Sequence, residues 1–430
     1  MDIATHFAAH LAQKSKIYED ALQAGGYDRL IIASGFETFR YRDDLHNVFN
    51  TNPYFNEWLP LQNNPNCFLI IEPGLKPTLF RYLPNDYWHS APPSLDEHFM
   101  QHFNVHEFTD SPELVLQNAA YIGPENKQFS GIAQNPDKVM NIIDFHRAWK
   151  SEYELTCLRE ANKLAVKGHV AAAEAFYAGK SEYDIHMEYL NAISCQDAEL
   201  PYNSIVALNE NAGVLHHMLL SKQRPAMSRS FLIDAGAPFN GYAADISRTY
   251  VHPDGSQVFK QLVAGVDTLQ QELVACVTPG LSYVDIHLKS HELVAGLLVE
   301  SGLIKCSVEE AIANAITSVF LPHGIGHLLG LQVHDKGGHF NSIEGDLSPP
   351  PEQHPALRCT RTIEENMVFT IEPGVYFIPQ LLASLGGNNH IDHNLLAELV
   401  PYGGVRIEDN VVATNGIAEN MTRDAYASLI

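Results

Sequence analysis

Three histidines lie within twelve positions of the sequence, separated by glycines, and four carboxylates precede or follow them. These residues are His323, His327 and His334, with Asp234, Asp245, Glu372 and Glu408. Each carboxylate lies within or beside a short β-like run, where an unpaired charge is costly to bury unless a cation compensates it. One imidazole together with four carboxylates indicates a site for two metal ions.

The two aspartates are predicted to meet on a β-hairpin. Residues 230–234 form an apolar strand that ends in Asp234, residues 235–241 form a turn, and residues 242–250 run back past Asp245. Two like charges side by side repel each other unless cations lie between them. A lone Asp in such a segment is more often a turn residue, and the pair alone leaves both interpretations open.

The two glutamates lie in alternating segments. In residues 367–372 the side chains of Thr370 and Glu372 share one face, and in residues 405–412 Arg406 and Glu408 do the same. Two divalent cations would balance the four carboxylates, and the Arg406 guanidinium would neutralise a bridging hydroxide. The alternative is that Arg406 and Glu408 form a surface cross-strand pair of little energetic weight.

The histidine segment is predicted to be a loop. His323 and His327 are spaced as on one face of a helix, as in H-E-x-x-H zinc sites, but Pro322, Gly324 and Gly326 favour a loop. Both histidines are therefore not expected to bind one ion, and a lone histidine is more often structural. Oxygen-rich ligation suits Mn²⁺ better than Zn²⁺. Paired metals with a bridging water imply hydrolysis.

These motifs together resemble the pita-bread dinuclear metallopeptidases, which include prolidase, aminopeptidase P and methionine aminopeptidase. The resemblance rests on Asp234 and Asp245, on the segments 323–327, 333–335, 370–374 and 405–410, and on residues 357–361 before the Glu372 strand. The N-terminal part of the chain excludes a minimal methionine aminopeptidase. Over nearly its full length, including residues 41–44, 202–211 and 215–216, the chain is similar to marine-bacterial prolidases also known as organophosphorus acid anhydrolases.

The resemblance implies a set of metal ligands and catalytic residues. The ligands would be Asp234, Asp245, His327, Glu372 and Glu408, with Asp245 and Glu408 bridging two Mn²⁺, Co²⁺ or other divalent ions. His216, His323, His334 and Arg406 would support catalysis. Arg358 would hold the free carboxylate of a dipeptide, and the remaining substrate-binding residues would be Tyr202, Leu215, Tyr283, Val333 and Leu357. His217 departs from relatives, which often carry an aromatic residue there, so substrate preference near that wall is open.

The implied activity is hydrolysis of dipeptides with C-terminal proline, with a side activity on organophosphorus esters and fluorides. The alternatives are an aminopeptidase P-like enzyme acting on longer Xaa-Pro peptides, and a metal-free binding module of the same fold. The second alternative is disfavoured because all five ligand residues are present. The family is typically dimeric, which implies a homodimer or a higher oligomer in which the Asp44 loop of one subunit closes the site of the other.

The elements that must position these residues are divided between two predicted domains. The 430 residues exceed one ordinary core, and the boundary is expected just before Ser151, giving an α/β domain at 1–150 and a catalytic domain at 151–430. The first domain shows a helix near 3–25 and strands at 30–34, 67–71, 78–82 and 121–123, with a polar loop at 40–66. Helices are predicted at 151–178, 182–194, 256–276, 283–301 and 308–319, the first two opened by S-x-x-E/D capping boxes. The fold class is α+β, with helices covering one face of a curved, largely antiparallel sheet.

The amino-acid composition limits the kinds of molecule that the protein is expected to bind. With 27 basic and 51 acidic side chains the net charge is −24, which argues against nucleic acid and anionic membrane surfaces and favours a small-molecule partner. No run of eighteen apolar residues and no signal-peptide pattern is present. The six cysteines are scattered without a paired spacing, so a cytoplasmic location is expected.

Overall fold

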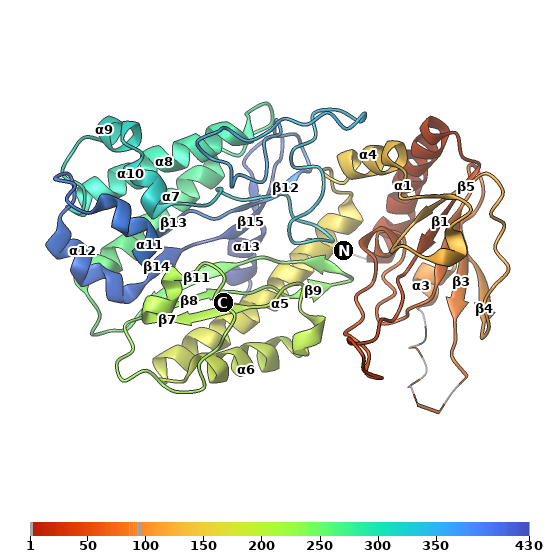
Figure 1. The fold of residues 1–430 in the computed structure, drawn as a ribbon, viewed down its shortest axis with the longest axis horizontal. Helices are drawn as coiled ribbons and strands as arrows, with labels where there is room; N and C mark the ends of the chain where they lie inside the picture. Colours follow the sequence, from red (N-terminus) through yellow and green to blue (C-terminus); the bar gives the residue numbers. More distant parts are fainter. Residues whose placement is uncertain are drawn as a thin grey trace. The chain divides into compact units, whose positions relative to one another are not determined.

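The computed structural model describes residues 3–85, 87, 88, 90, 92, 94 and 96–429 of the chain (Figure 1). The chain forms two compact units. The first contains Met1–Cys157 and Phe340–Leu347, and the second contains Leu158–His339 and Ser348–Ile430. A short segment from the C-terminal half of the sequence therefore belongs to the N-terminal unit.

The first unit is built on one mixed sheet with the strand order β4-β3-β2-β1-β5-β6. The strands are β1 (Arg29–Ala33), β2 (Phe68–Ile71), β3 (Thr78–Tyr82), β4 (Asn104–Phe108), β5 (Ala119–Ile122) and β6 (Ala133–Gln134). The helices are α1 (Ile3–Gly25), α2 (Pro53–Asn56), α3 (Glu97–Met100) and α4 (Asp137–His146). β2 and β3 pair antiparallel, whereas β1 pairs with β5 in parallel.

Residues 40–66 differ from the single surface loop that their polar composition predicts. The part up to residue 50 is largely exposed, with one β-bridge between Phe39 and His46. The part that follows contains α2 and buries Phe55, Trp58, Leu59 and Leu61. Because these apolar side chains are interspersed among Asn and Pro, composition alone does not reveal that they belong to a core.

Every strand pairing described in the second unit is antiparallel. The strands are β7 (Ile205–Leu208), β8 (Ser230–Asp234), β9 (Pro238–Phe239), β10 (Tyr242–Ala243), β11 (Ser247–Val251), β12 (Val368–Ile371), β13 (Gly374–Tyr376), β14 (Gly404–Arg406), β15 (Asp409–Val412) and β16 (Glu419–Asn420). The helices are α5 (Glu152–Tyr177), α6 (Glu182–Ile193), α7 (Gln257–Ala275), α8 (Tyr283–Glu300), α9 (Val308–Ala313), α10 (Ile316–Phe320), α11 (Pro379–Leu382), α12 (His393–Leu399) and α13 (Met421–Ala427).

Alternation along β7 and β8 decides which face the helices cover. Val206 and Ile233 belong to the buried cluster formed with α5 and α6, which lie along this sheet in Figure 1. Their neighbours Ala207 and Leu232 point to the other face, where they pack with Tyr376. The predicted α+β fold with helices on an antiparallel sheet is confirmed.

Both predicted capping boxes are present. The Ser151 amide donates to Glu154 Oε2 at 2.9 Å and the Glu154 amide donates to Ser151 Oγ at 3.3 Å. Ser181 and Asp184 cap α6 in the same reciprocal way. These bonds satisfy amides that the first turn of a helix leaves without partners.

Two predicted elements are interrupted in the structure. The helix expected at 308–319 is two short helices, because Ala315 between them has a left-handed backbone (φ +53°). The strand expected at 405–412 is divided into β14, which pairs with β13, and β15, which pairs with β12. Glu408 lies at the division and bridges to Ser247 of β11. The interruption therefore places this carboxylate between three strands.

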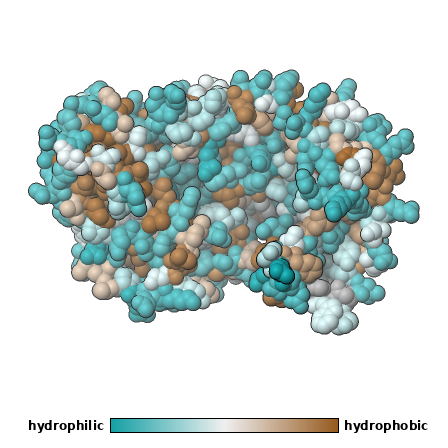
Figure 2. Space-filling model, viewed as in Figure 1, coloured by the Kyte–Doolittle hydropathy of each residue, from teal (hydrophilic) through white to brown (hydrophobic). Residues whose placement is uncertain are grey.

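No helix in the described part of the chain is long and apolar enough to span a bilayer. On the face drawn in Figure 2, hydrophilic residues predominate and hydrophobic residues occur in small groups. This distribution agrees with the acidic composition of the chain.

Candidate metal centre

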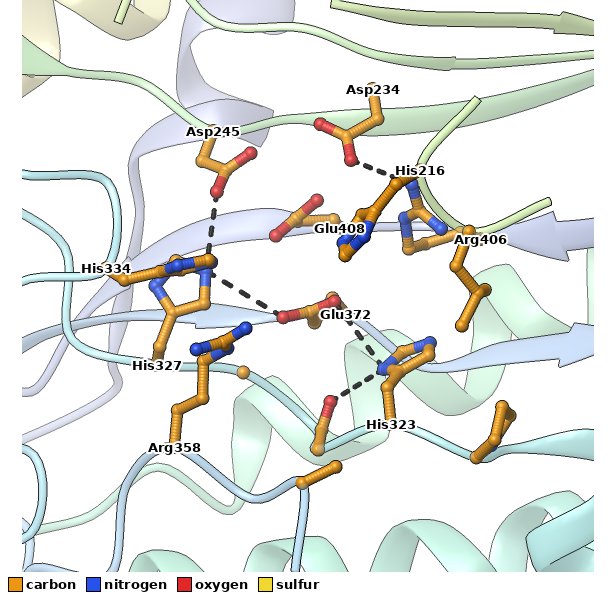
Figure 3. A pocket seen from close by; sticks show the side chains of 15 residues that line it. His216, Asp234, Asp245, His323, His327, His334, Arg358, Glu372, Arg406 and Glu408 are labelled. Carbon is orange, nitrogen blue, oxygen red and sulfur yellow. Dashed lines mark hydrogen bonds and ion pairs between the residues drawn. The ribbon is translucent and has the colours of Figure 1, made fainter. Parts of the chain in front are cut away.

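The predicted ligands converge on one cavity of about 290 Å³ in the second unit (Figure 3). Most of its lining residues carry a charged or imidazole side chain, and they come from segments far apart in the sequence. The lining consists of Leu215, His216, Asp234, Asp245, Pro322, His323, Gly324, Gly326, His327, His334, Ala356, Arg358, Glu372, Arg406 and Glu408. All five proposed ligands are in this set, so the structure brings them together.

The β8–β11 pair carries the two aspartates. Asp234 ends β8 opposite Ser247, and Asp245 lies just before β11 begins. The Tyr202 hydroxyl lies 2.8 Å from Asp234 Oδ1 and 2.6 Å from Asp245 Oδ1, so one phenol holds both carboxylates. The Asn410 side chain accepts from the Asp245 amide at 3.0 Å and donates to the Asp245 carbonyl oxygen, which fixes the backbone at this position.

His327 and Glu372 are positioned by a loop that lies along β12, as the glycines predicted. The His327 amide donates to Thr370 Oγ1 at 3.1 Å, and the Glu372 amide donates to the Ile325 carbonyl at 2.9 Å. Gly326 permits this approach, since its φ is +151° and a Cβ there would lie 2.1 Å from the Thr370 carbonyl oxygen. His327 Nδ1 bonds to the Leu328 carbonyl at 3.0 Å, so its Nε2 faces Asp245 Oδ2 at 3.3 Å and Glu372 Oε1 at 3.8 Å.

Glu408 and Arg406 share one buried network rather than a surface pair. Ser247 Oγ donates to Glu408 Oε2 at 2.7 Å and accepts from Arg406 Nε at 2.8 Å. Arg406 Nη2 donates to Asp234 Oδ2 at 2.7 Å. Arg406 is 4% exposed and Glu408 2%, so this guanidinium is a fixed counter-charge inside the carboxylate cluster.

Burial shifts the pKa values of the carboxylates away from their ordinary range. Burial raises the pKa of Asp234 to about 6 against the opposing effect of Arg406, and burial raises the pKa of Glu372 to about 7. Burial, reinforced by the charges of Asp245 and Glu372, raises the pKa of Glu408 well above its usual value. Burial also disfavours ionised Asp245, but its contacts with His327 outweigh this and lower its pKa. The positive charge of Arg406 therefore does not by itself offset the burial and mutual repulsion of the four carboxylates.

This donor set fits divalent metal ions. One ligand atom each from Asp245, His327 and Glu408 lies within 4.8 Å of the others, and all three residues are buried. His327 Nε2 and carboxylate oxygens face the same space, an arrangement that a cation stabilises and that is otherwise repulsive. Four carboxylates with one imidazole suit Mn²⁺ and similar oxygen-preferring ions.

His323 lines the cavity but both of its ring nitrogens are bonded. Nδ1 lies 2.7 Å from the Gly324 carbonyl and Nε2 lies 2.8 Å from the Tyr376 hydroxyl. Burial, together with the nearby Arg406, lowers the pKa of His323 to about 4, so the ring is neutral. With Nδ1–H donating to the carbonyl, Nε2 accepts from Tyr376, whose oxygen accepts from Arg406 Nη1 at 2.9 Å. Both ring nitrogens of His323 therefore have protein partners, whereas His327 Nε2 faces the carboxylates.

His334 and Arg358 are available at the cavity. Both are exposed, and the ring of His334 lies 4.4 Å from that of His327, edge to face. Partial burial and the positive charges of His327 and Arg358 lower the pKa of His334 to about 4. The Arg358 guanidinium has no hydrogen bond or ion pair with any residue that the structure describes. His216 and Leu215 complete this part of the lining.

Several residues predicted to form the substrate wall do not line this cavity. Tyr283 is fully buried and donates to the Thr370 carbonyl at 2.7 Å, and Tyr202 holds the aspartates. Leu357 is buried and lines a neighbouring cavity, and Val333 lines neither. Asp44 is exposed in the first unit.

His217 points away from the cavity. Its Nε2 lies 2.9 Å from Glu182 Oε2, and Glu182 also accepts from the Leu208 and Ser221 amides and from Asn211. His217 is not among the residues that line the cavity. The buried Glu182 ties together the segment that carries Leu215 and His216, and its only signal in the sequence was its place in the first turn of α6.

Three further residues around the centre were missed by sequence reasoning: Tyr376, Ser247 and Asn410. Each contacts a proposed ligand or Arg406 through its side chain. Their residue types are common in strands and turns, and nothing in their spacing indicated the contacts. Only the proximity of Ser247 to Asp245 and of Asn410 to Glu408 in sequence offered a hint.

An antiparallel, helix-covered fold that gathers an imidazole and four carboxylates, two of them buried and two half-buried, is typical of metal-dependent hydrolases. The model of metallopeptidase family M24 matches residues 156–415, and that of the Xaa-Pro dipeptidase N-terminal domain matches residues 5–145. The chain belongs to metallopeptidase family M24.

Relatives agree with this assignment, and solved structures share the fold. An Xaa-Pro dipeptidase of Pseudoalteromonas atlantica is 44% identical and one of Shewanella sediminis is 42% identical, each with 98% of both chains covered. The fold is similar to that of Escherichia coli aminopeptidase P with the inhibitor Pro-Leu (TM-score 0.73, 22% identity, 96% and 95% coverage). It is also similar to aminopeptidase PepP of Pseudomonas aeruginosa (TM-score 0.75, 22% identity, the same coverage).

Proposed function

We propose that this protein is an Xaa-Pro dipeptidase that uses two divalent metal ions. Relatives identical at 44% and 42% over nearly the full length carry that name. The observation that carries the proposal is the Arg358 guanidinium, which has no partner among the described residues and lies at a cavity otherwise rich in carboxylates. A cation in this place is suited to the free carboxylate of a C-terminal proline.

The ions would be held by Asp234, Asp245, His327, Glu372 and Glu408, with Asp245 and Glu408 shared between them, and Mn²⁺ or Co²⁺ is the proposed metal. Bound divalent ions activate water at neutral pH and polarise the scissile carbonyl. The buried donor atoms of Asp245, His327 and Glu408, and the repulsion among neighbouring carboxylates that raises the pKa of Glu408, support this arrangement.

The chain's own residues bind and orient the substrate. Arg358 would pair with the proline carboxylate, a charge-assisted contact worth about 1.5–3 kcal/mol. His334, neutral at pH 7 because its pKa is lowered, would donate a hydrogen bond to the oxygen on which charge develops. His216 lines the same cavity and would contact the substrate. Arg406 keeps Asp234 ionised and balances the negative charge of the centre.

An aminopeptidase P-like activity on longer peptides is the alternative, because the structural neighbours carry that name. Arg358 distinguishes the two, since a carboxylate bound there leaves no room for a residue after proline. The metal-reconstituted protein should hydrolyse Ala-Pro and should turn over Ala-Pro-Ala poorly. Faster hydrolysis of the tripeptide would refute the dipeptidase proposal.

We also propose that organophosphorus esters and fluorides are hydrolysed in the same cavity. A tetrahedral phosphorus centre resembles the intermediate of amide hydrolysis, so groups such as His334 that stabilise one can stabilise the other. The peptide reaction remains primary because Arg358 has no role on a neutral phosphotriester. A non-hydrolysed Xaa-Pro analogue should inhibit both reactions with one inhibition constant, and two different constants would place the activity elsewhere.

We propose that the protein is a homodimer, or a higher oligomer, in which residues 36–50 of one copy close the cavity of another. In this segment Phe39, Tyr41, Leu45 and Val48 are 55–92% exposed, which is unusual for a contiguous group of large apolar side chains. Mixing an Asp44→Ala chain with an Asp245→Ala chain should restore activity through one intact composite site. Re-equilibrated mixtures that remain inactive would refute this arrangement.

A cytoplasmic location completes the proposal. The six cysteines form no disulfide in the structure, and four of them are buried. Free thiols of this kind are compatible with a reducing compartment.

A further inference from the structure

A second group of potential metal ligands lies on α8 and on the loop before Arg358. His287 and His291 are one helical turn apart on α8, and His354 faces both of them from the loop. The ring centroid of His354 lies 4.5 Å from that of His287 and 4.5 Å from that of His291, and the centroids of His287 and His291 are 4.9 Å apart. We call these residues the three-histidine cluster.

The nitrogens of this cluster are buried without partners. His287 is 1% exposed, and neither Nδ1 nor Nε2 bonds to any described residue. His291 is 3% exposed, its Nδ1 lies 3.0 Å from Thr317 Oγ1, and its Nε2 has no partner in the described chain. Buried polar atoms in folded proteins are nearly always bonded, so three unpartnered nitrogens on two adjacent rings of one cluster require an explanation.

The imidazoles are also in the right protonation state to bind a cation. Burial and the neighbouring histidines lower the pKa of His287 to about 3 and that of His291 to about 4, and burial lowers the pKa of His354. Neutral imidazole keeps a lone pair on one nitrogen, and that lone pair is the metal donor. No proton has to be displaced at neutral pH.

The spacing of the donor atoms suits one ion. One nitrogen from each histidine lies within 4.8 Å of the other two, so a single point lies within about 2.8 Å of all three. Zinc–nitrogen bonds are about 2.0–2.1 Å, and small side-chain rotations would close the difference. An adjoining cavity of about 80 Å³, lined by His287 and His354, leaves space for a fourth ligand such as water.

We propose that His287, His291 and His354 form a separate site for a divalent transition ion that prefers imidazole, with Zn²⁺ as the representative. The i, i+4 histidines on one helix face supply two ligands and the loop supplies the third. With nitrogen donors and no carboxylate, the cluster selects against Mn²⁺ and Mg²⁺, which the oxygen-rich centre favours. Pro322, His323 and Ala356 line both cavities, so an ion here would fix the loop that leads to Arg358.

The test counts Zn²⁺ in protein whose carboxylate centre has been removed. Full-length Glu408→Ala protein, titrated with Zn²⁺ by calorimetry, should bind one ion, and X-ray absorption should show a shell containing three imidazoles. Adding His354→Ala should weaken that binding at least about 100-fold, because loss of a ligand costs more than loss of a residue that only orients a ligand, which typically costs about 10- to 100-fold. His393→Ala, which removes an exposed histidine on α12, is the matched control and should change nothing.

A second measurement keeps the test valid if Glu408→Ala does not fold. Wild-type protein and the His354→Ala variant, each checked by circular dichroism, are saturated with Mn²⁺, incubated with Zn²⁺ and desalted. The wild-type protein should then retain one more Zn²⁺ per chain than the variant. Equal Zn²⁺ content in the two proteins, or an absorption spectrum with oxygen ligands only, would overturn the proposal. Because the readout is metal content, its failure is distinguishable from failure of the dipeptidase proposal.

Discussion

Removing the Tyr376 hydroxyl tests whether the neutral, oriented His323 ring contributes to catalysis. Tyr376 is fully buried and its oxygen links Arg406 Nη1 at 2.9 Å to His323 Nε2 at 2.8 Å. Tyr376→Phe deletes both bonds without changing the ring. A hydrogen bond to a charged group is worth about 1.5–3 kcal/mol. If that orientation is needed mainly in the transition state, kcat on Ala-Pro should fall about 10- to 100-fold.

The assay separates this effect from simple destabilisation. KM should stay within about twofold, because the contact with Arg358 is intact, and metal content should not change. Tyr402→Phe is the matched control, since the Tyr402 hydroxyl accepts from the Ser256 amide at 2.7 Å and does not line the cavity. Both variants should lose about 1–2 kcal/mol of stability. Equal kcat values for the two variants would refute the role assigned to Tyr376.

Three further predictions concern the metal centre and Arg358, the proposed partner of the substrate carboxylate. Glu408→Ala should lose both ions and the activity together, and an active, metal-free protein by elemental analysis would contradict it. Arg358→Ala should raise KM for Ala-Pro about tenfold or more and leave an amidated substrate unaffected, because only the free carboxylate is anchored; equal losses would assign Arg358 another role. As the pH rises from about 4.5 to 7, the metal-free protein should become less thermally stable. The pKa values of Asp234 and Glu372 are raised in the folded state, so in this range the folded state binds more protons than the unfolded one. Saturating Mn²⁺ should abolish this slope, and a flat melting profile without metal would contradict the pKa shifts.

Local signals in the sequence marked the four carboxylates and the histidine segment as a candidate metal site, and the family resemblance singled out His327 as the imidazole ligand. Asp234 ends an apolar strand, Glu372 ends an alternating one, and His327 lies in a glycine-rich loop. Such signals depend only on a few neighbouring residues, so they survive without knowledge of the fold. The structure places all of these side chains at one cavity.

The supporting contacts were not predictable because they join residues distant in sequence. Tyr376 contacts His323 across 53 positions, and Ser247 contacts Glu408 across 161. The sequence around a tyrosine or serine in a strand does not indicate which distant residue it will contact. The orientation of His217 toward Glu182 is likewise decided by tertiary packing, and so is the burial of Tyr283.

The missed elements have a similar cause. β4 exposes most of its side chains, and β6 contains only Ala133 and Gln134, so neither shows the alternation of a half-buried strand. The break between α9 and α10 occurs at Ala315, a strong helix former, where propensity alone predicts continuation. Tertiary context overrides local preference at these positions.

The division of the 405–412 segment has a consequence for the order of folding. The β8–β11 hairpin can form from neighbouring residues, but Arg406 and Glu408 join it only after a chain closure of about 160 residues. Non-local closures of this length are slow steps of folding. Until that step Asp234 and Asp245 lie side by side without the Arg406 guanidinium. The metal centre is therefore incomplete while the chain folds and cannot direct its folding. We therefore expect metal loading to follow folding, and a refolding chain to regain secondary structure well before it regains metal affinity.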